Sequence, residues 1–164
     1  MLSSARRIMS LTNPSKKMSK SDPDWRSRIL ITDSKEDIAL KLRTAVTDSL
    51  DGVSYDREKR PGVSNILDIM YYMDESIAES QDALARDMQD MSMKALKERA
   101  AEVVDAGLRD VRGRYEEIMG RADVAGYLSE SENVGCKRVK TMAGHTIVRV
   151  KKALGLGGLL PVSE

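Results

Sequence analysis

The chain has 164 residues, of which 41% are hydrophobic and 32% are charged, and its formal net charge at pH 7 is +1. This composition excludes a disordered tail and a surface that is basic all over, and it can fill the core of one ordinary domain. No apolar run approaches the roughly 20 residues of a membrane span, and the single cysteine, Cys136, excludes an internal disulfide.

Residues 11–28 are predicted to form an exposed loop, because Asn-Pro at residues 13–14 and Asp-Pro at residues 22–23 punctuate a stretch without apolar period. Residues 17–21 of this loop read KMSKS, which places two cations and two hydroxyls on one flexible turn. Such a turn can wrap a triphosphate while negative charge builds on a departing pyrophosphate. On the pentapeptide alone, an ordinary solvated basic loop remains the alternative.

The chain beyond the loop is predicted to be mainly helical. Residues 28–32 are short and β-branched, so we expect one strand there. Asp33 or Ser34 can cap the helix that follows, in which apolar residues recur at helical spacing up to Val46. Further helices are expected at residues 63–73, within 75–91, at 96–119 and at 124–154.

The expected architecture is a mainly α fold, in which the loop and the short strand are followed by an antiparallel helical bundle. A bundle by itself specifies no function. His145, the only histidine, is expected to be a packed or surface residue, and Trp25 is expected to anchor the base of the loop, with stacking on RNA or adenine as the alternative. The last helix is expected to turn six apolar side chains inward: Leu128, Val139, Met142, Ile147, Val150 and Leu154.

The order of several motifs resembles that of bacterial-type tryptophanyl-tRNA synthetases. The blocks are RIMSL at residues 7–11, KMSKS at 17–21, ITD at 31–33, AVTDS at 45–49 and RPGVSNI at 60–66. The two last blocks favour the tryptophan enzyme over its tyrosine relative. The resemblance implies a remnant of a class I, Rossmann-type synthetase. Residues 1–33 would end the catalytic domain, and residues 34–160 would form a helical domain that binds the tRNA anticodon.

The resemblance also implies a reaction in which the carboxylate of tryptophan attacks the α-phosphate of ATP, pyrophosphate leaves, and the tryptophanyl group passes from the adenylate to tRNA(Trp). Lys17 and Lys20 would be the catalytic residues, because they would stabilise the phosphates in the transition state. The loop hydroxyls would donate hydrogen bonds, and Mg²⁺ would arrive with ATP, so no residue is expected to bind a metal. The implied ATP-binding set is Ile8, Lys17, Met18, Ser19, Lys20 and Ser21.

The second class I motif, HIGH, needs two histidines, and the sequence contains only His145. We therefore expect the C-terminal portion of a tryptophan-tRNA ligase that is inactive alone, with a non-catalytic helical tRNA-binding module as the alternative. The family implies a homodimer, and we expect the mitochondrial matrix, or alternatively the cytoplasm. Contacts to tRNA phosphates are expected from Lys137, Arg138, Lys140, Arg149, Lys151 and Lys152, for each of which a solvated helix face is the alternative.

Overall fold

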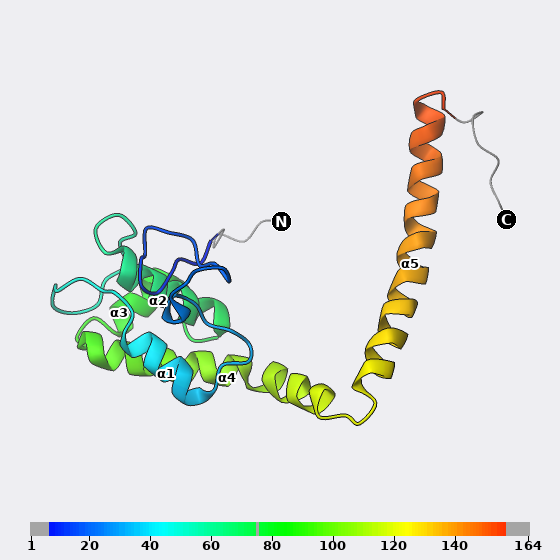
Figure 1. Cartoon of the computed structure of the whole chain (residues 1–164). Helices are drawn as coiled ribbons and strands as arrows, with labels where there is room; N and C mark the ends of the chain where they lie inside the picture. Colours follow the sequence, from blue (N-terminus) through cyan, green and yellow to red (C-terminus); the bar gives the residue numbers. More distant parts are fainter. Residues whose placement is uncertain (1–6, 75, 157–164) are drawn as a thin grey trace. The chain divides into compact units, whose positions relative to one another are not determined.

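A computed structural model describes residues 7–74 and 76–156, and this part of the chain is mainly helical (Figure 1). The chain divides into two compact units, Met1–Tyr115 and Glu116–Glu164. No helix among the described residues is both long and apolar enough to cross a membrane. The helices are the 3-10 helix η1 (Trp25–Ser27) and the α-helices α1 (Lys35–Arg43), α2 (Pro61–Met73), α3 (Gln81–Asp87), α4 (Met93–Met119) and α5 (Val124–Ala153). The five predicted helical regions are therefore confirmed.

The beginning of α1 is set by a cap. The Ser34 hydroxyl accepts a hydrogen bond from the Asp37 amide at 3.0 Å, which confirms Ser34 as one of the two predicted caps. Glu36 and Asp37 add negative charge to the first turn, where the helix dipole is positive. The polar loop therefore ends at Ser34, and α1 begins at the next residue.

The strand predicted at residues 28–32 is not formed, and that prediction was wrong. The Asp33 amide donates to the Leu30 carbonyl at 3.1 Å, and the Asp33 carboxylate accepts the Leu30 amide at 2.8 Å. The turn thus uses the amide and the carbonyl of Leu30, which in a strand would form hydrogen bonds with a neighbouring strand. Among the described residues, β pairing is limited to an isolated bridge between Met9 and Lys17.

The core of unit 1 is built around α2, whose residues 62–70 are all buried. Pro61 begins this helix at a position where no intrahelical amide bond is lost. A Cβ on Gly62 would lie 2.2 Å from the Val46 carbonyl oxygen, so the AVTDS and RPGVSN segments approach each other more closely than any side chain allows. The same core cluster contains Leu11, Ile38, Leu42, Ile66, Leu67, Leu84, Leu96 and Val104, which come from the loop region and from α1 to α4.

Unit 1 thus holds the KMSKS loop and the first helices on one core. The boundary predicted between residues 33 and 34 lies inside this unit. Whether that boundary separates two functional regions stays a prediction.

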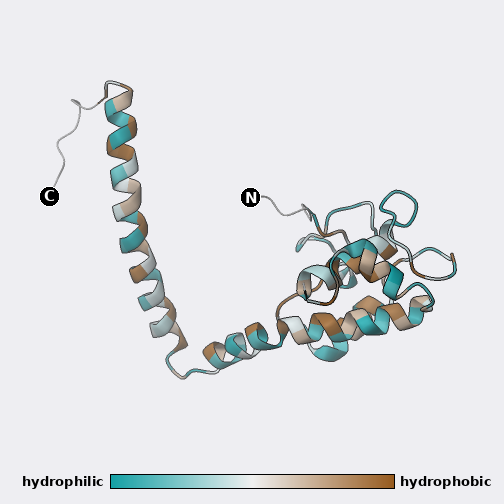
Figure 2. Ribbon diagram, turned by 180° about the vertical axis from the view of Figure 1, so that it is seen from behind, coloured by the Kyte–Doolittle hydropathy of each residue, from teal (hydrophilic) through white to brown (hydrophobic). Residues whose placement is uncertain are grey.

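In unit 2, α5 has no buried residue. The six apolar side chains predicted to face inward are between 46% and 67% exposed, and Figure 2 shows apolar and polar residues interspersed along the helix. Their predicted burial is therefore wrong for the unit taken by itself, because the described residues of unit 2 offer α5 no other long helix to pack against. His145 and Cys136 are also exposed.

Candidate functional site

The KMSKS segment begins at a fixed position because it pairs with the chain that precedes it. The Met18 amide donates to the Ile8 carbonyl at 3.0 Å, and the Ser10 amide donates to the Lys16 carbonyl at 2.8 Å. Between these bonds lies the antiparallel bridge of Met9 and Lys17. Ile8 and Met18 are consequently neighbours in space although ten positions separate them.

We call residues 8–11 the loop stem, and hydrogen bonds to three other segments of unit 1 hold it on the core. The Asn65 side chain of α2 accepts the Met9 amide at 2.8 Å and donates to the Met9 carbonyl at 2.9 Å. The Leu11 amide donates to the Ser27 carbonyl at 2.9 Å, and the Leu11 carbonyl accepts the Val46 amide at 2.7 Å. The RPGVSN segment therefore supplies the amide side chain that positions the loop stem.

A hollow of about 410 Å³ lies at the KMSKS loop, and we call it the loop hollow. Four of its lining residues are cations and four are apolar, and none of the described residues that line it carries a carboxylate. A lining of this kind fits a flat apolar group that is attached to a polyanion. The lining residues are Arg7, Ile8, Lys17, Met18, Lys20, Arg28, Ile29 and Leu30.

The loop hollow brings together four of the six residues predicted to bind ATP: Ile8, Lys17, Met18 and Lys20. Lys17 and Lys20 are exposed, so both ammonium groups are open to an anion arriving from solvent. The hydroxyls of Ser19 and Ser21 lie 3.0 Å from each other, and neither residue lines the loop hollow. Hydrogen bonds from these two serines to ATP stay a prediction.

Arg28 is a lining residue that the sequence did not single out. Its guanidinium donates to the Asp22 carbonyl at 2.7 Å and to the Asp24 carbonyl at 3.4 Å, so it closes the C-terminal side of the KMSKS loop. Asp24 in turn caps η1 by accepting the Arg26 amide at 3.0 Å. Hydrogen bonds from the Arg26 side chain are the main reason that the pKa of Asp24 lies below its ordinary value. No spacing in the sequence marks Arg28 for this task.

The base of the loop rests on a buried ion pair that sequence reasoning also missed. The Lys41 ammonium lies 2.5 Å from the Asp33 carboxylate, and their side chains are 2% and 9% exposed. The same ammonium is 5.1 Å from the centre of the Trp25 ring, a cation–π distance. Trp25 is 46% exposed, so one part of the ring anchors the loop and the other part remains open to solvent. Its alternative role, stacking on a base, stays a prediction.

A larger hollow, of about 550 Å³, lies between α1 and the first half of α4. Its rim carries both signs of charge: Lys35, Arg43, Lys94 and Lys97 against Glu36, Glu98 and Glu102. Such a mixed rim does not select a polyanion. The loop hollow, with cations alone among its charged lining residues, is therefore the better candidate for a phosphate-bearing ligand.

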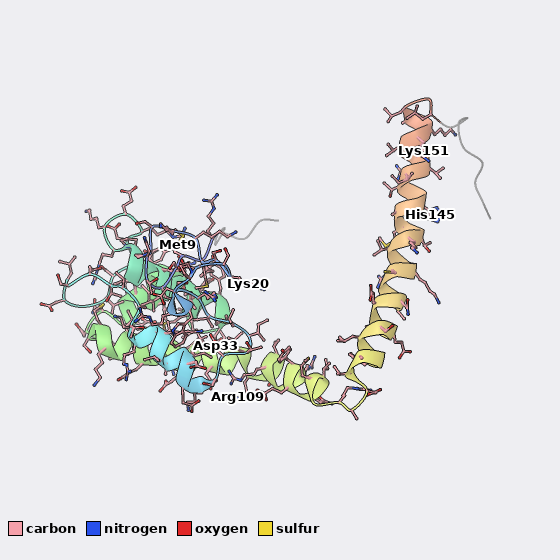
Figure 3. All side chains as sticks on the ribbon, in the orientation of Figure 1. Met9, Lys20, Asp33, Arg109, His145 and Lys151 are labelled. Carbon is pink, nitrogen blue, oxygen red and sulfur yellow. The ribbon has the colours of Figure 1, made fainter. Side chains whose placement is uncertain are left out.

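The six basic residues predicted to contact tRNA all lie on α5, and all are exposed (Lys151 is labelled in Figure 3). Arg149 and Lys152 line a shallow depression together with Thr146 and Val150, whereas Lys137 does not. Lys151 and Lys152 stand in the last helical turn, where positive charge also stabilises the helix by itself. Their contact with RNA therefore stays a prediction.

Comparison with known proteins gives a consistent result. Residues 2–109 match the family model of class I tRNA synthetases for tryptophan and tyrosine (W and Y). The chain is 37% identical over 149 residues to a tryptophan–tRNA ligase of Rickettsia felis, which covers 91% of this chain and 43% of the relative. It is 34% identical over 151 residues to a tryptophan–tRNA ligase of Bacillus subtilis, covering 92% of this chain and 44% of that relative.

A solved structure supports the same relationship. The tryptophanyl-tRNA synthetase of Mycoplasma pneumoniae superposes with a TM-score of 0.65 and 26% identity, over 93% of this chain and 44% of that protein. The chain thus spans less than half the length of the relatives that it matches.

Proposed function

The chain belongs to the class I tRNA synthetases, and within them to the tryptophan–tRNA ligase family, and from this premise we propose that its KMSKS loop binds ATP while tryptophan is activated. The carboxylate oxygen of tryptophan would bond to the α-phosphorus of ATP, and the bond to the bridging oxygen of pyrophosphate would break. The adenylate would then pass its tryptophanyl group to a hydroxyl of tRNA(Trp), releasing AMP.

One observation carries this proposal: the two KMSKS lysines share a hollow with Arg28 and with four apolar side chains. Pyrophosphate gains negative charge as it leaves, and positioned cations are most effective where charge develops in the transition state. Lys17 and Lys20 would take this role. The apolar lining, including Ile8 and Met18, would receive the adenine.

Mg²⁺ would accompany ATP rather than reside in the chain. The described residues contain no group of three or more His, Cys, Asp or Glu placed to hold a metal ion. Mg²⁺ prefers oxygen ligands, and the phosphates supply them. The loop cations would then neutralise the charge that the metal leaves uncompensated.

Tryptophan-dependent exchange of pyrophosphate into ATP tests this proposal, in an enzyme of full family length that carries residues 1–164. Lys20→Ala is expected to lower the exchange rate by about 100-fold or more, the usual loss for one preorganised donor. Lys16→Ala is the matched control, because Lys16 is exposed on the same loop but does not line the loop hollow. Equal rates for the two variants would contradict the assigned role.

A second candidate function, a non-catalytic tRNA-binding module, is favoured by the charge of α5. Residues 133–153 of this helix contain six Lys or Arg and no Asp or Glu. Neutralising phosphates with such residues makes affinity fall steeply with salt. Filter binding of tRNA(Trp) by the chain at several salt concentrations tests this candidate, and an absence of salt-dependent affinity would exclude it.

Assembly and location complete the proposal. A homodimer is proposed from the family resemblance, and sedimentation of the chain at several concentrations would detect self-association. The mitochondrial matrix, with the cytoplasm as the alternative, is proposed as the site of action, and subcellular fractionation distinguishes the two.

A further inference from the structure

The buried Asp33–Lys41 pair contacts both the base of the loop and one wall of the loop hollow. The Lys41 ammonium lies 5.1 Å from the centre of the ring of Trp25, which begins η1 just after the KMSKS segment. The Asp33 carboxylate accepts the amide of Leu30, a lining residue of the hollow, at 2.8 Å. One ion pair therefore contacts the base of the loop and fixes the backbone of a wall of the hollow.

The pair is also tied to α4. The Arg112 guanidinium donates to the Asp33 carbonyl at 2.9 Å and to the Asp105 carboxylate at 2.6 Å. Its hydrogen bond to Asp105 is the main reason that the pKa of Asp105 lies below its ordinary value. Arg109 lies 3.6 Å from the same carboxylate and contacts Asp105 alone of the two acidic residues (Arg109 and Asp33 are labelled in Figure 3). Arg112 is thus the α4 residue that joins the ion pair to this helix.

Stability alone is a weak reason to keep such a pair. Removing two charges from water costs about as much as their attraction returns, so a buried pair can often be replaced by neutral side chains without loss. Asp33 and Lys41 do what an apolar pair could not, because one end accepts a hydrogen bond from a backbone amide and the other places a cation against an aromatic ring.

We propose that Asp33 and Lys41 are positioning residues that set the distance between the KMSKS loop and the 28–30 wall of the loop hollow, and that Arg112 links this setting to α4. Neither residue touches the ligand in this arrangement. Only the identity of the ligand, ATP, rests on the proposed function. The positioning itself is a property of the chain without nucleotide.

The first experiment therefore uses the chain alone. Asp33→Ala removes the acceptor of the Leu30 amide, and hydrogen exchange at Leu30 is expected to rise roughly tenfold, as for one lost hydrogen bond. Acrylamide quenching of Trp25, the only tryptophan, should rise as well. Asp48→Asn is the matched control, because Asp48 pairs with buried Arg60 in the same unit and its ion pair shares no residue with the loop.

The double variant Asp33→Ala/Lys41→Met separates positioning from stability. Its unfolding midpoint should recover relative to either single variant, since no unpaired charge is left buried. Its Leu30 exchange and Trp25 quenching should stay high, because the amide still lacks its acceptor and the ring its cation. Recovery of all three quantities together, or an unchanged Leu30 exchange rate in Asp33→Ala, would overturn the proposal.

The link to α4 is tested by two arginine variants. Arg112→Gln loses the bond to the Asp33 carbonyl and should speed exchange at Leu30, whereas Arg109→Gln, which weakens the other contact of Asp105, should not. Equal exchange rates in the two variants would remove Arg112 from the proposal.

A final titration with Mg·ATP distinguishes this inference from the proposed function. In an enzyme of full family length that carries residues 1–164, Asp33→Ala should weaken Mg·ATP binding roughly tenfold relative to Asp48→Asn, about the effect of one lost hydrogen bond. If an enzyme of full family length that carries residues 1–164 does not bind Mg·ATP while Leu30 exchange in the chain responds as expected, the proposed ligand is wrong and the positioning role is supported. If binding occurs and Asp33→Ala leaves it unchanged, the positioning role is wrong.

Discussion

Replacing Asn65 by alanine should release the loop stem from α2. The Asn65 side chain is 4% exposed and makes two hydrogen bonds to the backbone of Met9, of 2.8 and 2.9 Å. Each such bond contributes about 1 kcal/mol net, and leaving a partly buried backbone group unpaired raises that figure. Because both bonds belong to one partly buried residue, we expect a loss of about 2–3 kcal/mol in the free energy of unfolding.

Urea unfolding followed by the fluorescence of Trp25 measures this loss in unit 1. Asn13→Ala is the matched control, since Asn13 is an exposed asparagine of the same segment whose side chain accepts one bond from the Ser15 amide at 3.1 Å. That change should stay within about 0.5 kcal/mol of the unaltered chain. If Asn65→Ala is no more destabilising than Asn13→Ala, the loop stem is not held by α2 as described.

Two further predictions concern pH and close packing. Burial, followed by the carboxylate of Asp68, raises the pKa of Tyr55 to about 12, so stability from its neutral phenol is complete below pH 10 and lost as the pH rises through about 12. Absorbance at 295 nm should show a tyrosine that ionises late, and unfolding midpoints should fall in the same range; ionisation together with the other tyrosines would contradict this. Gly62→Ala should destabilise by about 2 kcal/mol or more, because its Cβ would meet the Val46 carbonyl. In Gly113→Ala the new Cβ meets nothing within 4 Å, so this change should stabilise α4 by up to about 1 kcal/mol. Thermal unfolding measures both variants. A loss of stability in Gly113→Ala, or no loss in Gly62→Ala, would refute the packing account.

Local signals in the sequence were sufficient for the helices. The start of α1 could be predicted from Ser34, because a serine hydroxyl can cap a helix by accepting the amide three residues later. The extent of α4 could be predicted because apolar residues recur at helical spacing along it. The strand at residues 28–32 failed for the opposite reason. A strand forms only beside a partner strand, and local composition does not show whether one is present. Here the Asp33 carboxylate accepts the Leu30 amide and stabilises a turn instead.

The candidate site could be predicted where its residues belong to short continuous sequence motifs. KMSKS and Ile8 follow from motif order, and the structure places four of the six ATP-binding candidates around one hollow. Arg28, Asp33 and Lys41 were not predictable as parts of the site. Their roles depend on contacts between side chains and backbone groups that are brought together only when loop and helix share a core.

The apolar face of α5 shows a further limit of periodicity. The spacing of Leu128, Val139 and Ile147 correctly predicts a helix but does not say what covers it, and in its own unit the helix is exposed. Apolar residues at helical spacing show that one face of a helix is apolar. They do not show which other part of a protein packs against that face.

The central claim is that Lys17 and Lys20 together hold the phosphates of ATP, and calorimetric titration with Mg·ATP of an enzyme of full family length that carries residues 1–164 tests it most directly. The double variant Lys17→Ala/Lys20→Ala should lose most of the binding enthalpy and affinity, while Lys16→Ala, which removes a loop charge outside the hollow, should leave both nearly unchanged. Binding of Mg·ATP that is equally strong in the double variant would contradict the claim.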